Sequence, residues 1–386
     1  MYNINMLNKI AKVGTKNLDP AKYNVGTEVA NPDGILVRSA AMHDMEFGPE
    51  LKAIARAGAG VNNIPIEKCS EQGIVVFNTP GANANAVKEL AIAALLLASR
   101  KIVDGINWAS TLTGDDVAKQ VEAGKSAFVG PEIYGKTLGV IGLGAIGAKL
   151  ANAALDLGMK VYGHDPYITV DAAWHLATSV EKAAERDDIY ANCDYISLHV
   201  PSTPDTKGMI NKETIAKMKD GVRIINLARA DLVNDDDIKE ALASGKVASY
   251  VVDFPTAATV GVPGIVAIPH LGASTPESED NCAVMACAEL RDFLESGNIR
   301  NSVNYPEVII PYAGGTRICV FHKNIPNVIA SITAILSDKG INVENMANRS
   351  KKDNAYTLVE ISGNLPADAI DAIKAVESVA RVTVIG

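Results

Sequence analysis

A glycine-rich turn between two short apolar segments constrains the fold of this chain more than any other feature. Residues 137–141 predict a strand, and the motif Gly142-x-Gly144-x-x-Gly147 follows them directly. An Ala- and Leu-rich helical stretch comes next, and then a second apolar segment that ends at Asp165. This order of strand, turn, helix, strand and acid is the context that a dinucleotide-binding βαβ unit requires. The alternative is a glycine-rich turn in a βαβ unit of another kind, which would not need the acid.

The residue types in this motif suit a dinucleotide for physical reasons. The three glycines permit, in order, the tight turn, the approach of a pyrophosphate to the backbone, and close packing of helix on strand. The helix that begins at Ala145 and Ile146 offers the pyrophosphate free N–H groups and the positive end of its dipole. Asp165 is placed to bind an adenosine ribose, and its charge repels the extra phosphate of NADP. The sequence therefore predicts NAD as the cofactor.

Composition places the chain among globular proteins with several domains. A length of 386 residues allows two or three domains, and 48% hydrophobic with 21% charged residues is ordinary. The formal charge of −9 argues against nucleic acid or an anionic membrane as the main partner. The longest apolar run, residues 90–98, is too short to span a bilayer, and the N-terminus has no apolar secretory segment, so we expect a cytoplasmic location. The five cysteines show no C-x-x-C spacing, which favours buried free thiols over a metal site or disulfides.

Alternating strand-like and helical segments predict two α/β domains. Four strand-like segments follow the glycine turn, at residues 194–200, 223–227, 250–253 and 265–268, and helical stretches separate them. They predict a doubly wound, Rossmann-type parallel sheet. The N-terminal segments 34–39 and 73–80 predict a second α/β domain, of flavodoxin-like type, to which the helix at residues 282–295 is expected to return. The expected domains are residues 1–82 with 283–312, residues 83–282, and residues 313–386.

The last of these segments reads strand, helix, strand, strand, helix, strand between residues 317 and 385. This βαββαβ order is typical of a ferredoxin-like fold. Residues 312–316 read as a hinge-like break before it. Because the segment has no cofactor motif, we expect a regulatory module, or alternatively one that only pairs sheet edges between subunits.

Arg229 and His270 follow predicted strand ends on the side of the sheet where the glycine turn lies. Interconversion of a 2-hydroxy acid and a 2-keto acid needs a cation for the carboxylate and carbonyl, and an acid/base of intermediate pKa. Taken singly, Arg229 could pair with Asp231 and His270 could cap a turn. Taken together beside a dinucleotide site, they favour a catalytic pair. Arg38 also ends a strand, where either a ligand contact or a surface ion pair is expected.

The chain resembles the D-2-hydroxyacid dehydrogenases over essentially its whole length. Within them it is similar to the branch that oxidises 3-phospho-D-glycerate to 3-phosphohydroxypyruvate for serine synthesis. The resemblance rests on the glycine motif with Asp165, on the segments 198–201 and 269–275, and on Asn226-x-x-Arg229. It implies an NAD-dependent enzyme with 3-phosphoglycerate as substrate. A hydroxypyruvate, glyoxylate or 2-oxoglutarate reductase and a non-catalytic NAD sensor are the alternatives.

The resemblance also implies roles for individual residues. Arg229 would bind the substrate carboxylate and keto oxygen, His270 would be the acid/base, and Asp253 would face the nicotinamide carboxamide. Other implied cofactor contacts are His199, Val200, Pro201, Thr206, Ala228 and Gly272. Implied substrate contacts are Arg38, Ser39, Gly60 and Asn83, with Lys125 compensating for Ala40, where relatives carry a second arginine.

The main departure from the family lies beside the expected acid/base. Relatives carry a glutamate after Asp253 that hydrogen-bonds the histidine, but alanine stands at 257 and 258 here. Without a neighbouring carboxylate, the imidazole of His270 is expected to gain its proton only in more acidic solution, unless Asp253 or another acid takes over.

The C-terminal segment resembles an ACT domain, an amino-acid-sensing module. The resemblance implies a homo-oligomer, dimer or tetramer, in which His322, Asn324 and Asn342 bind L-serine across paired modules. Asn327 replaces a usual glycine in this segment, and the alternative role of Asn324 is to cap the following helix.

Overall fold

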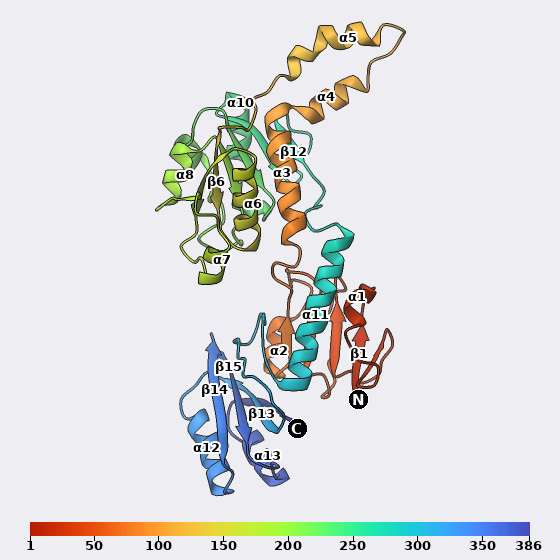
Figure 1. Cartoon of the computed structure of the whole chain (residues 1–386), viewed down its shortest axis with the longest axis vertical. Coiled ribbons are helices and arrows are strands. Elements are labelled where there is room, and N and C mark those ends of the chain that lie inside the picture. Colours follow the sequence, from red (N-terminus) through yellow and green to blue (C-terminus); the bar gives the residue numbers. More distant parts are fainter. The chain divides into compact units, whose positions relative to one another are not determined.

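The structure, a computed structural model, describes the backbone of residues 1–386 and every side chain except that of Asp171. The chain forms two compact units (Figure 1), of which the first contains residues 1–83 and 276–386 and the second residues 84–275. The second unit is therefore inserted in the first. The second boundary lies at 275/276 and not at the expected 282/283, because helix α11 (Pro276–Ser296) belongs as a whole to the first unit.

The first unit contains a five-stranded parallel sheet in the order β2-β1-β3-β4-β5, which is the order of flavodoxin-like sheets. Its strands are short and apolar, and every residue of β3 is buried. Helix α11 contributes ten buried residues, and its partners on the sheet include β3, β4 and β5. The elements are β1 (Tyr2–Met6), α1 (Lys12–Thr15), β2 (Tyr23–Gly26), β3 (Gly34–Val37), β4 (Ala53–Arg56), α2 (Ile66–Glu71) and β5 (Val75–Phe77).

The end of the first unit is a four-stranded antiparallel sheet in the order β14-β15-β13-β16. Its elements follow the expected βαββαβ order, and α12 and α13 share an apolar cluster with the sheet. The bounds are β13 (Thr316–Lys323), α12 (Val328–Asp338), β14 (Val343–Lys351), β15 (Asn354–Ile361), α13 (Ala367–Lys374) and β16 (Val379–Ile385).

This C-terminal sheet shares a hydrophobic core with the parallel sheet before it. The ring of Phe321 on β13 lies 6.1 Å from that of Phe293 on α11 and 5.0 Å from that of Tyr305. Tyr356 on β15 donates a hydrogen bond to Gly297 O at 2.6 Å. The expected hinge at residues 312–316 therefore does not separate an independent module, because the sheet that follows completes the core of the first unit.

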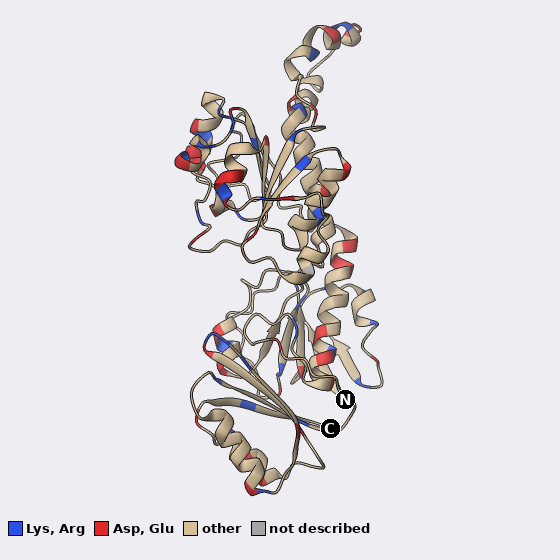
Figure 2. Ribbon diagram, turned by 60° about the vertical axis from the view of Figure 1, so that its left-hand side comes forward, with Lys and Arg blue, Asp and Glu red and all other residues tan. Residues whose placement is uncertain are grey.

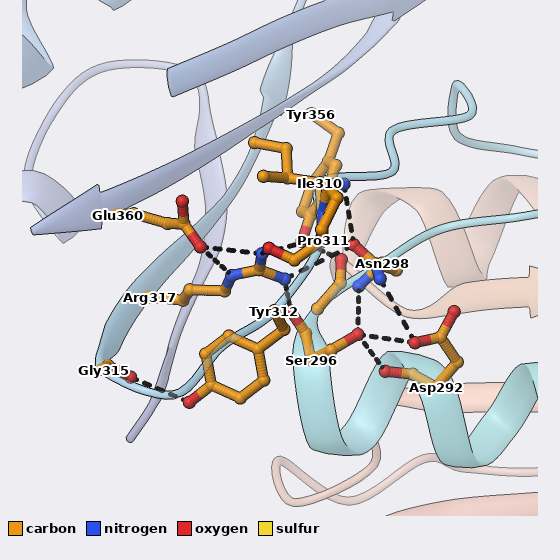
Figure 3. A network of polar contacts seen from close by, with 11 residues as sticks. Asp292, Ser296, Asn298, Ile310, Pro311, Tyr312, Gly315, Arg317, Tyr356 and Glu360 are labelled. Atoms are coloured by element: carbon orange, nitrogen blue, oxygen red, sulfur yellow. Dashed lines mark hydrogen bonds and ion pairs between the residues drawn. The ribbon is translucent and has the colours of Figure 1, made fainter. Parts of the chain in front are cut away.

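A buried arginine joins the two parts at the same place. Arg317 is fully buried, and Figure 3 shows its guanidinium between Glu360 and the end of α11. It is ion-paired with Glu360 at 2.8 Å and donates to Ser296 O at 2.6 Å. Further donations reach Ile310 O and Pro311 O. A buried charge with this many acceptors is compensated only in this arrangement, so it fixes the position of β13 against α11.

The second unit is built on a seven-stranded sheet in the order β12-β11-β10-β9-β6-β7-β8, and all of its pairings are parallel. The order reverses at β6, whose neighbours are β7 and β9, so ligands are expected beyond the carboxyl ends of β6 and β9. The strands are β6 (Thr137–Ile141), β7 (Lys160–His164), β8 (Glu181–Lys182), β9 (Tyr195–Leu198), β10 (Val222–Asn226), β11 (Val247–Val252) and β12 (Ile265–Ala267).

Helices flank this sheet, and charged residues lie mainly outside its strands (Figure 2). Figure 2 shows charged residues mainly on helices and loops, whereas the strands are mostly uncharged. No helix in the part of the chain that the structure describes is long and apolar enough to cross a membrane. All five cysteines are buried and unpaired. The helices are α3 (Ala84–Arg100), α4 (Ile102–Ala109), α5 (Val117–Gly124), η1 (Lys125–Phe128), α6 (Ala145–Asp156), α7 (Val170–Trp174), α8 (Arg186–Asn192), α9 (Lys212–Ala216), η2 (Ala230–Leu232) and α10 (Asp235–Ser244).

Candidate active site

The glycine turn joins β6 to α6, and its three glycines have different surroundings. Gly142 has a φ of +95°, and a Cβ there would lie 2.7 Å from His199 O. A Cβ at Gly147 would lie 1.9 Å from Gly142 O, so only glycine lets α6 approach the strand. At Gly144 a Cβ would meet nothing within 4 Å. Helix α6 begins directly after it, at Ala145 and Ile146, and no side chain caps the N–H groups of this helix start. A pyrophosphate therefore has open access to the N-terminus of α6, as NAD binding requires.

Asp165 follows β7 and braces the same turn. Its Oδ2 accepts a hydrogen bond from the N–H of Leu143 at 2.8 Å, and its Oδ1 accepts from Tyr167 at 2.9 Å. Each carboxylate oxygen keeps a lone pair with which it can accept from a ribose hydroxyl. Leu143 and Asp165 also line a cavity of about 460 Å³ between β7 and the segment around β8.

The segment 199–206 continues from β9 beside the glycine turn. The imidazole of His199 contacts Ser197 Oγ at 2.9 Å, and burial lowers the pKa of His199 to about 4, so the ring is neutral at physiological pH. Val200 borders the turn, because its Cγ1 lies 3.0 Å from a Cβ built at Gly142. Thr206 Oγ1 donates to Pro201 O at 2.6 Å and so closes the loop on itself. The backbone of this loop is thus set before any ligand binds.

Asn226 at the end of β10 holds the loop that carries Arg229. Its Oδ1 accepts from the N–H groups of Ala228 at 3.2 Å and Arg229 at 3.4 Å, and its Nδ2 donates to Arg229 O at 2.8 Å. The sequence indicates Asn226 only as part of a motif. A polar residue at the end of a buried strand was the available signal for this bracing role. Asp231 accepts from Ser202 Oγ at 2.6 Å, so the expected alternative of an Arg229–Asp231 ion pair is not formed.

Asp253 follows β11 and is almost fully buried, at 1% exposure. Its Oδ2 accepts from the N–H of Gly272 at 3.2 Å, whereas its Oδ1 has no hydrogen-bond partner. Burial is the main cause that raises the pKa of this carboxyl, and it outweighs the Gly272 hydrogen bond and the charges of His270 and Arg229. A buried, unpartnered oxygen of this kind suits an amide donor such as a nicotinamide carboxamide.

His270 follows β12 in a left-handed conformation with a φ of +48°. Its N–H donates to Asp253 O at 2.9 Å, which fixes the backbone despite this unfavourable region. Its ring lies on that of Phe254, with centroids 4.3 Å apart, and the guanidinium carbon of Arg229 lies 5.5 Å from the centroid of the Phe254 ring. The structure therefore brings the predicted catalytic pair together around an aromatic ring, and His270 does not act as a turn cap.

In the first unit, Arg38 follows β3 and is held from two sides. The consecutive N–H groups of Arg38, Ser39 and Ala40 all donate to Asn8 Oδ1 at 3.0 Å. The Arg38 guanidinium is ion-paired with Glu279 on α11 at 2.7 Å, and both side chains are about half exposed. The surface ion pair expected as an alternative is thus present, and a phosphate at Arg38 would have to compete with Glu279.

A second cation, which the sequence argument missed, stands at the next strand end. Arg56 ends β4, where it pairs in register with Val37 immediately before Arg38. Its Nη1 lies 2.4 Å from a Cβ built at Gly58 and 3.9 Å from one at Gly60. The glycine loop 58–60 therefore covers this guanidinium. Adjacent parallel strands that both end in arginine were the available sequence signal.

Lys125 lies apart from the predicted catalytic pair within the second unit. It begins η1, is exposed and is ion-paired with Glu122. A Cβ at Gly130 would contact Ser99, so the segment that carries Lys125 returns to the end of α3. The C-terminal end of α3 lies near the start of β10, because Arg223 Nε donates a hydrogen bond to Ala98 O. The N-terminal end of α3 lies near the predicted catalytic pair, because Val87 approaches Gly272. Within the second unit, α3 lies between Lys125 and the strand ends that carry Arg229 and His270, and the substrate contact of Lys125 stays a prediction. Asn83 immediately precedes α3.

Comparison with known proteins adds to this geometry. Residues 92–272 match the NAD-binding domain of D-isomer-specific 2-hydroxyacid dehydrogenases. A hydroxypyruvate reductase of Thermotoga maritima is 40% identical over 259 residues, which cover 64% of this chain and 80% of that protein. The chain belongs to the D-isomer-specific 2-hydroxyacid dehydrogenase family. Its glycine turn and Asp165 lie in the NAD-binding domain that defines this family of NAD-dependent oxidoreductases.

This chain is also similar to proteins named D-3-phosphoglycerate dehydrogenase. The one from Synechocystis is 33% identical over 312 residues, which cover 78% of this chain and 54% of that protein. The NAD⁺-bound 3-phosphoglycerate dehydrogenase of Entamoeba histolytica has a structure similar to this one, with a TM-score of 0.61 and 28% identity over 78% of this chain and 98% of the other. The chain spans about half the length of the curated phosphoglycerate dehydrogenases that it matches.

The predicted effector residues lie on or beside strands of the C-terminal sheet, but not together within one chain. His322 is buried, and its ring nitrogens contact Lys323 O at 2.8 Å and Thr357 Oγ1 at 2.9 Å. Asn324 Nδ2 donates to Lys352 O, and α12 begins after Asn327, so Asn324 is not the helix cap. Asn327 has a φ of +70°, a conformation that asparagine tolerates in place of glycine.

Asn342 lies at the other end of the same sheet. It precedes Val343, which pairs with Ile361 at the end of β15, whereas Asn324 follows Lys323, which pairs with Asn354 at the start of β15. The two asparagines are thus separated by the length of a strand of eight residues. A single effector molecule cannot bridge them within one sheet, so a joint site requires a second chain.

Proposed function

We propose that this protein catalyses the NAD-dependent oxidation of 3-phospho-D-glycerate to 3-phosphohydroxypyruvate. The observation that carries the proposal is the placement of Arg229 and His270 around Phe254, on the strand-end side of an NAD-binding sheet. A guanidinium and an imidazole at that edge are the two groups that hydroxy-acid oxidation requires. The phosphorylated substrate is supported by Arg38 and by the names of the relatives from Synechocystis and Entamoeba.

The residues present fit NAD. Open space at Gly144, the uncapped start of α6 and the lone pairs of Asp165 suit a pyrophosphate and a ribose, while the unpartnered Asp253 Oδ1 suits a carboxamide. When bound, the nicotinamide supplies the acceptor for the hydride that leaves C2 of the substrate.

The chain's own residues would bind the substrate and transfer the proton. Arg229 binds the substrate carboxylate and the C2 oxygen, which orients C2 and stabilises the carbonyl as it forms. Neutral His270 accepts the proton of the C2 hydroxyl, so oxidation leaves a keto acid and an imidazolium. In the reverse direction the imidazolium returns that proton. Its protonation state therefore sets the pH dependence of reduction.

A second candidate is a reductase for small unphosphorylated keto acids, such as hydroxypyruvate, glyoxylate or 2-oxoglutarate. The ion pair of Arg38 with Glu279 favours it, because a carboxylate at this position opposes a phosphate. The hydroxypyruvate reductase of Thermotoga maritima favours it too, by its name. A non-catalytic NAD sensor is the third possibility.

Steady-state kinetics would decide between these functions. We expect purified protein with NADH to reduce 3-phosphohydroxypyruvate with a higher kcat/KM than hydroxypyruvate, glyoxylate and 2-oxoglutarate. A preference for an unphosphorylated acid would replace the proposed substrate. Binding of NADH, seen by fluorescence, without reduction of any of the four acids would support the sensor.

The same assay would test regulation. We propose that L-serine is an effector and that the protein acts in the cytoplasm. We also propose a homo-oligomer, because Asn324 and Asn342 could meet at one ligand only across two chains. Serine should lower the rate of wild-type protein and affect an Asn342→Ala variant less. Light scattering that gives the mass of one chain would contradict the oligomer.

A further inference from the structure

The surroundings of His270 differ from those that its family leads one to expect. Among the residues that the structure describes, no carboxylate makes a hydrogen bond or an ion pair with its ring. The positions where a glutamate was expected carry Ala257 and Ala258. The ring instead lies against Phe254.

We propose that Phe254 is the positioning residue of the Arg229–His270 pair and holds both side chains on its ring, where relatives use a carboxylate to hold the histidine. This inference rests on the proposed acid/base role of His270. Phe254 itself touches neither the transferred hydride nor the proton, so it acts through the two side chains that it contacts.

The geometry suits this role. The two rings are tilted by 44° with centroids 4.3 Å apart, which is contact distance for aromatic side chains. The guanidinium carbon of Arg229 at 5.5 Å is within the range of a cation–π contact. Phe254 is half-buried against the core of the second unit, so its ring is a fixed surface. The negative face of an aromatic ring attracts cations, which suits the guanidinium of Arg229.

Two charged groups of the second unit also act on His270. Asp253 lies near enough to interact with it by charge, but its Oδ2 is engaged by Gly272 and burial raises its pKa, which weakens its effect as an anion. Arg229 opposes a second positive charge, and its position on the Phe254 ring keeps that charge at a defined distance. The aromatic ring is thus the neighbour that fixes the position of the His270 side chain.

A matched pair of variants tests this inference. Phe254→Leu keeps an apolar side chain of similar size but removes the ring, whereas Phe254→Tyr keeps the ring. We expect Phe254→Leu to lower kcat for keto-acid reduction by roughly 10- to 100-fold through misplacement of both groups. Phe254→Tyr should keep the wild-type kcat, and the Kd for NADH should be unchanged in both variants.

Three kinetic results would overturn the inference. They are a wild-type kcat in Phe254→Leu, a kcat in Phe254→Tyr as low as that of Phe254→Leu, and a loss of NADH binding in parallel with activity. The last result would show that Phe254 only supports the fold.

A measurement without turnover separates this inference from the proposed function. The ring current of Phe254 should shift the NMR signals of the His270 C–H protons upfield, and they can be assigned with a His270→Asn variant. The shift should vanish in Phe254→Leu. Absence of the upfield shift in wild-type protein would overturn the inference even where Phe254→Leu does not fold. A wild-type protein that shows the shift but reduces no keto acid would instead refute the proposed function.

Discussion

Arg229 and Arg38 both follow the carboxyl ends of parallel strands, but their guanidinium groups meet different neighbours. Arg229 lies over an aromatic ring, and its expected acidic partner Asp231 is bound to Ser202. Arg38 is ion-paired with Glu279 on a helix from the other end of the first unit. Topology places the two cations alike, whereas residues distant in sequence decide which of them keeps its charge available to a ligand. We therefore expect Arg229 to serve every substrate and Arg38 to affect only the phosphorylated one.

The largest effect should come from Arg229→Ala. Loss of a cation at the developing carbonyl should lower kcat/KM about 10²- to 10³-fold for all four keto acids. Arg229→Lys should recover only part of it, because an ammonium cannot make a paired contact with a carboxylate. The Kd for NADH serves as the control. A loss restricted to phosphorylated substrate would reverse the roles of the two arginines.

Two acids on helix α11 also differ in their surroundings. Glu279 forms an exposed ion pair with Arg38, whereas Glu289 is buried and its Oε2 has no hydrogen-bond partner. Burial raises the pKa of Glu289 to about 8, so the folded protein retains a proton that the unfolded chain releases near pH 4.5. Its contribution to stability is full below pH 4.5 and is lost as the pH rises to 8. Between pH 5 and 8.5, wild-type protein should lose about 1–3 kcal/mol more of its unfolding free energy than Glu289→Gln. Urea unfolding of both at each pH measures this, and Glu279→Gln is the exposed control. Equal losses in all three proteins would show that Glu289 is ionised when folded.

Arg38→Ala should have a smaller and selective effect. Removal of a charge-assisted contact should raise KM for 3-phosphohydroxypyruvate roughly 10-fold, with little change for glyoxylate. Equal harm to both substrates in steady-state assays would mean that Arg38 supports the fold or the substrate carboxylate, and not the phosphate.

The smallest effect should come from Glu279→Gln. Exposed ion pairs are worth about 0.2–1 kcal/mol, so freeing Arg38 should lower KM for the phosphorylated substrate by no more than about fivefold. Glu277→Gln, on the same helix turn and without an ion pair to Arg38, is a matched control for total charge. A rise in KM for Glu279→Gln would show that Glu279 orients Arg38 for the phosphate.

The parts of this molecule that sequence predicts well are those governed by local rules. The glycine turn required particular residues at Gly142 and Gly147 for steric reasons, and the structure shows those contacts. The strand ends of a parallel sheet share an edge, which brought Arg229 and His270 together. The order of the C-terminal strands and helices followed from their hydrophobic patterns.

The parts that sequence did not predict depend on contacts between distant residues. Nothing near Arg38 in the sequence indicates Glu279, and the contact of Phe254 with His270 depends on how two separate loops pack. The sequence did not indicate that the length of α3 places the segment with Lys125 at the opposite end of the sheet of the second unit. Arg317 read as an ordinary strand residue, although it is fully buried among carbonyl oxygens.

The burial of Arg317 determines what removal of the C-terminal sheet would do to the rest of the first unit. Because Phe321 and Tyr356 fill the same interior as Phe293, a chain cut at residue 312 would uncover apolar surface along α11 and leave the carbonyl groups of Ser296 and Ile310 without their donor. We therefore expect removal of the C-terminal sheet to destabilise the first unit, and not to release an independent module. A ligand that binds this sheet would act directly on the shared core of the first unit.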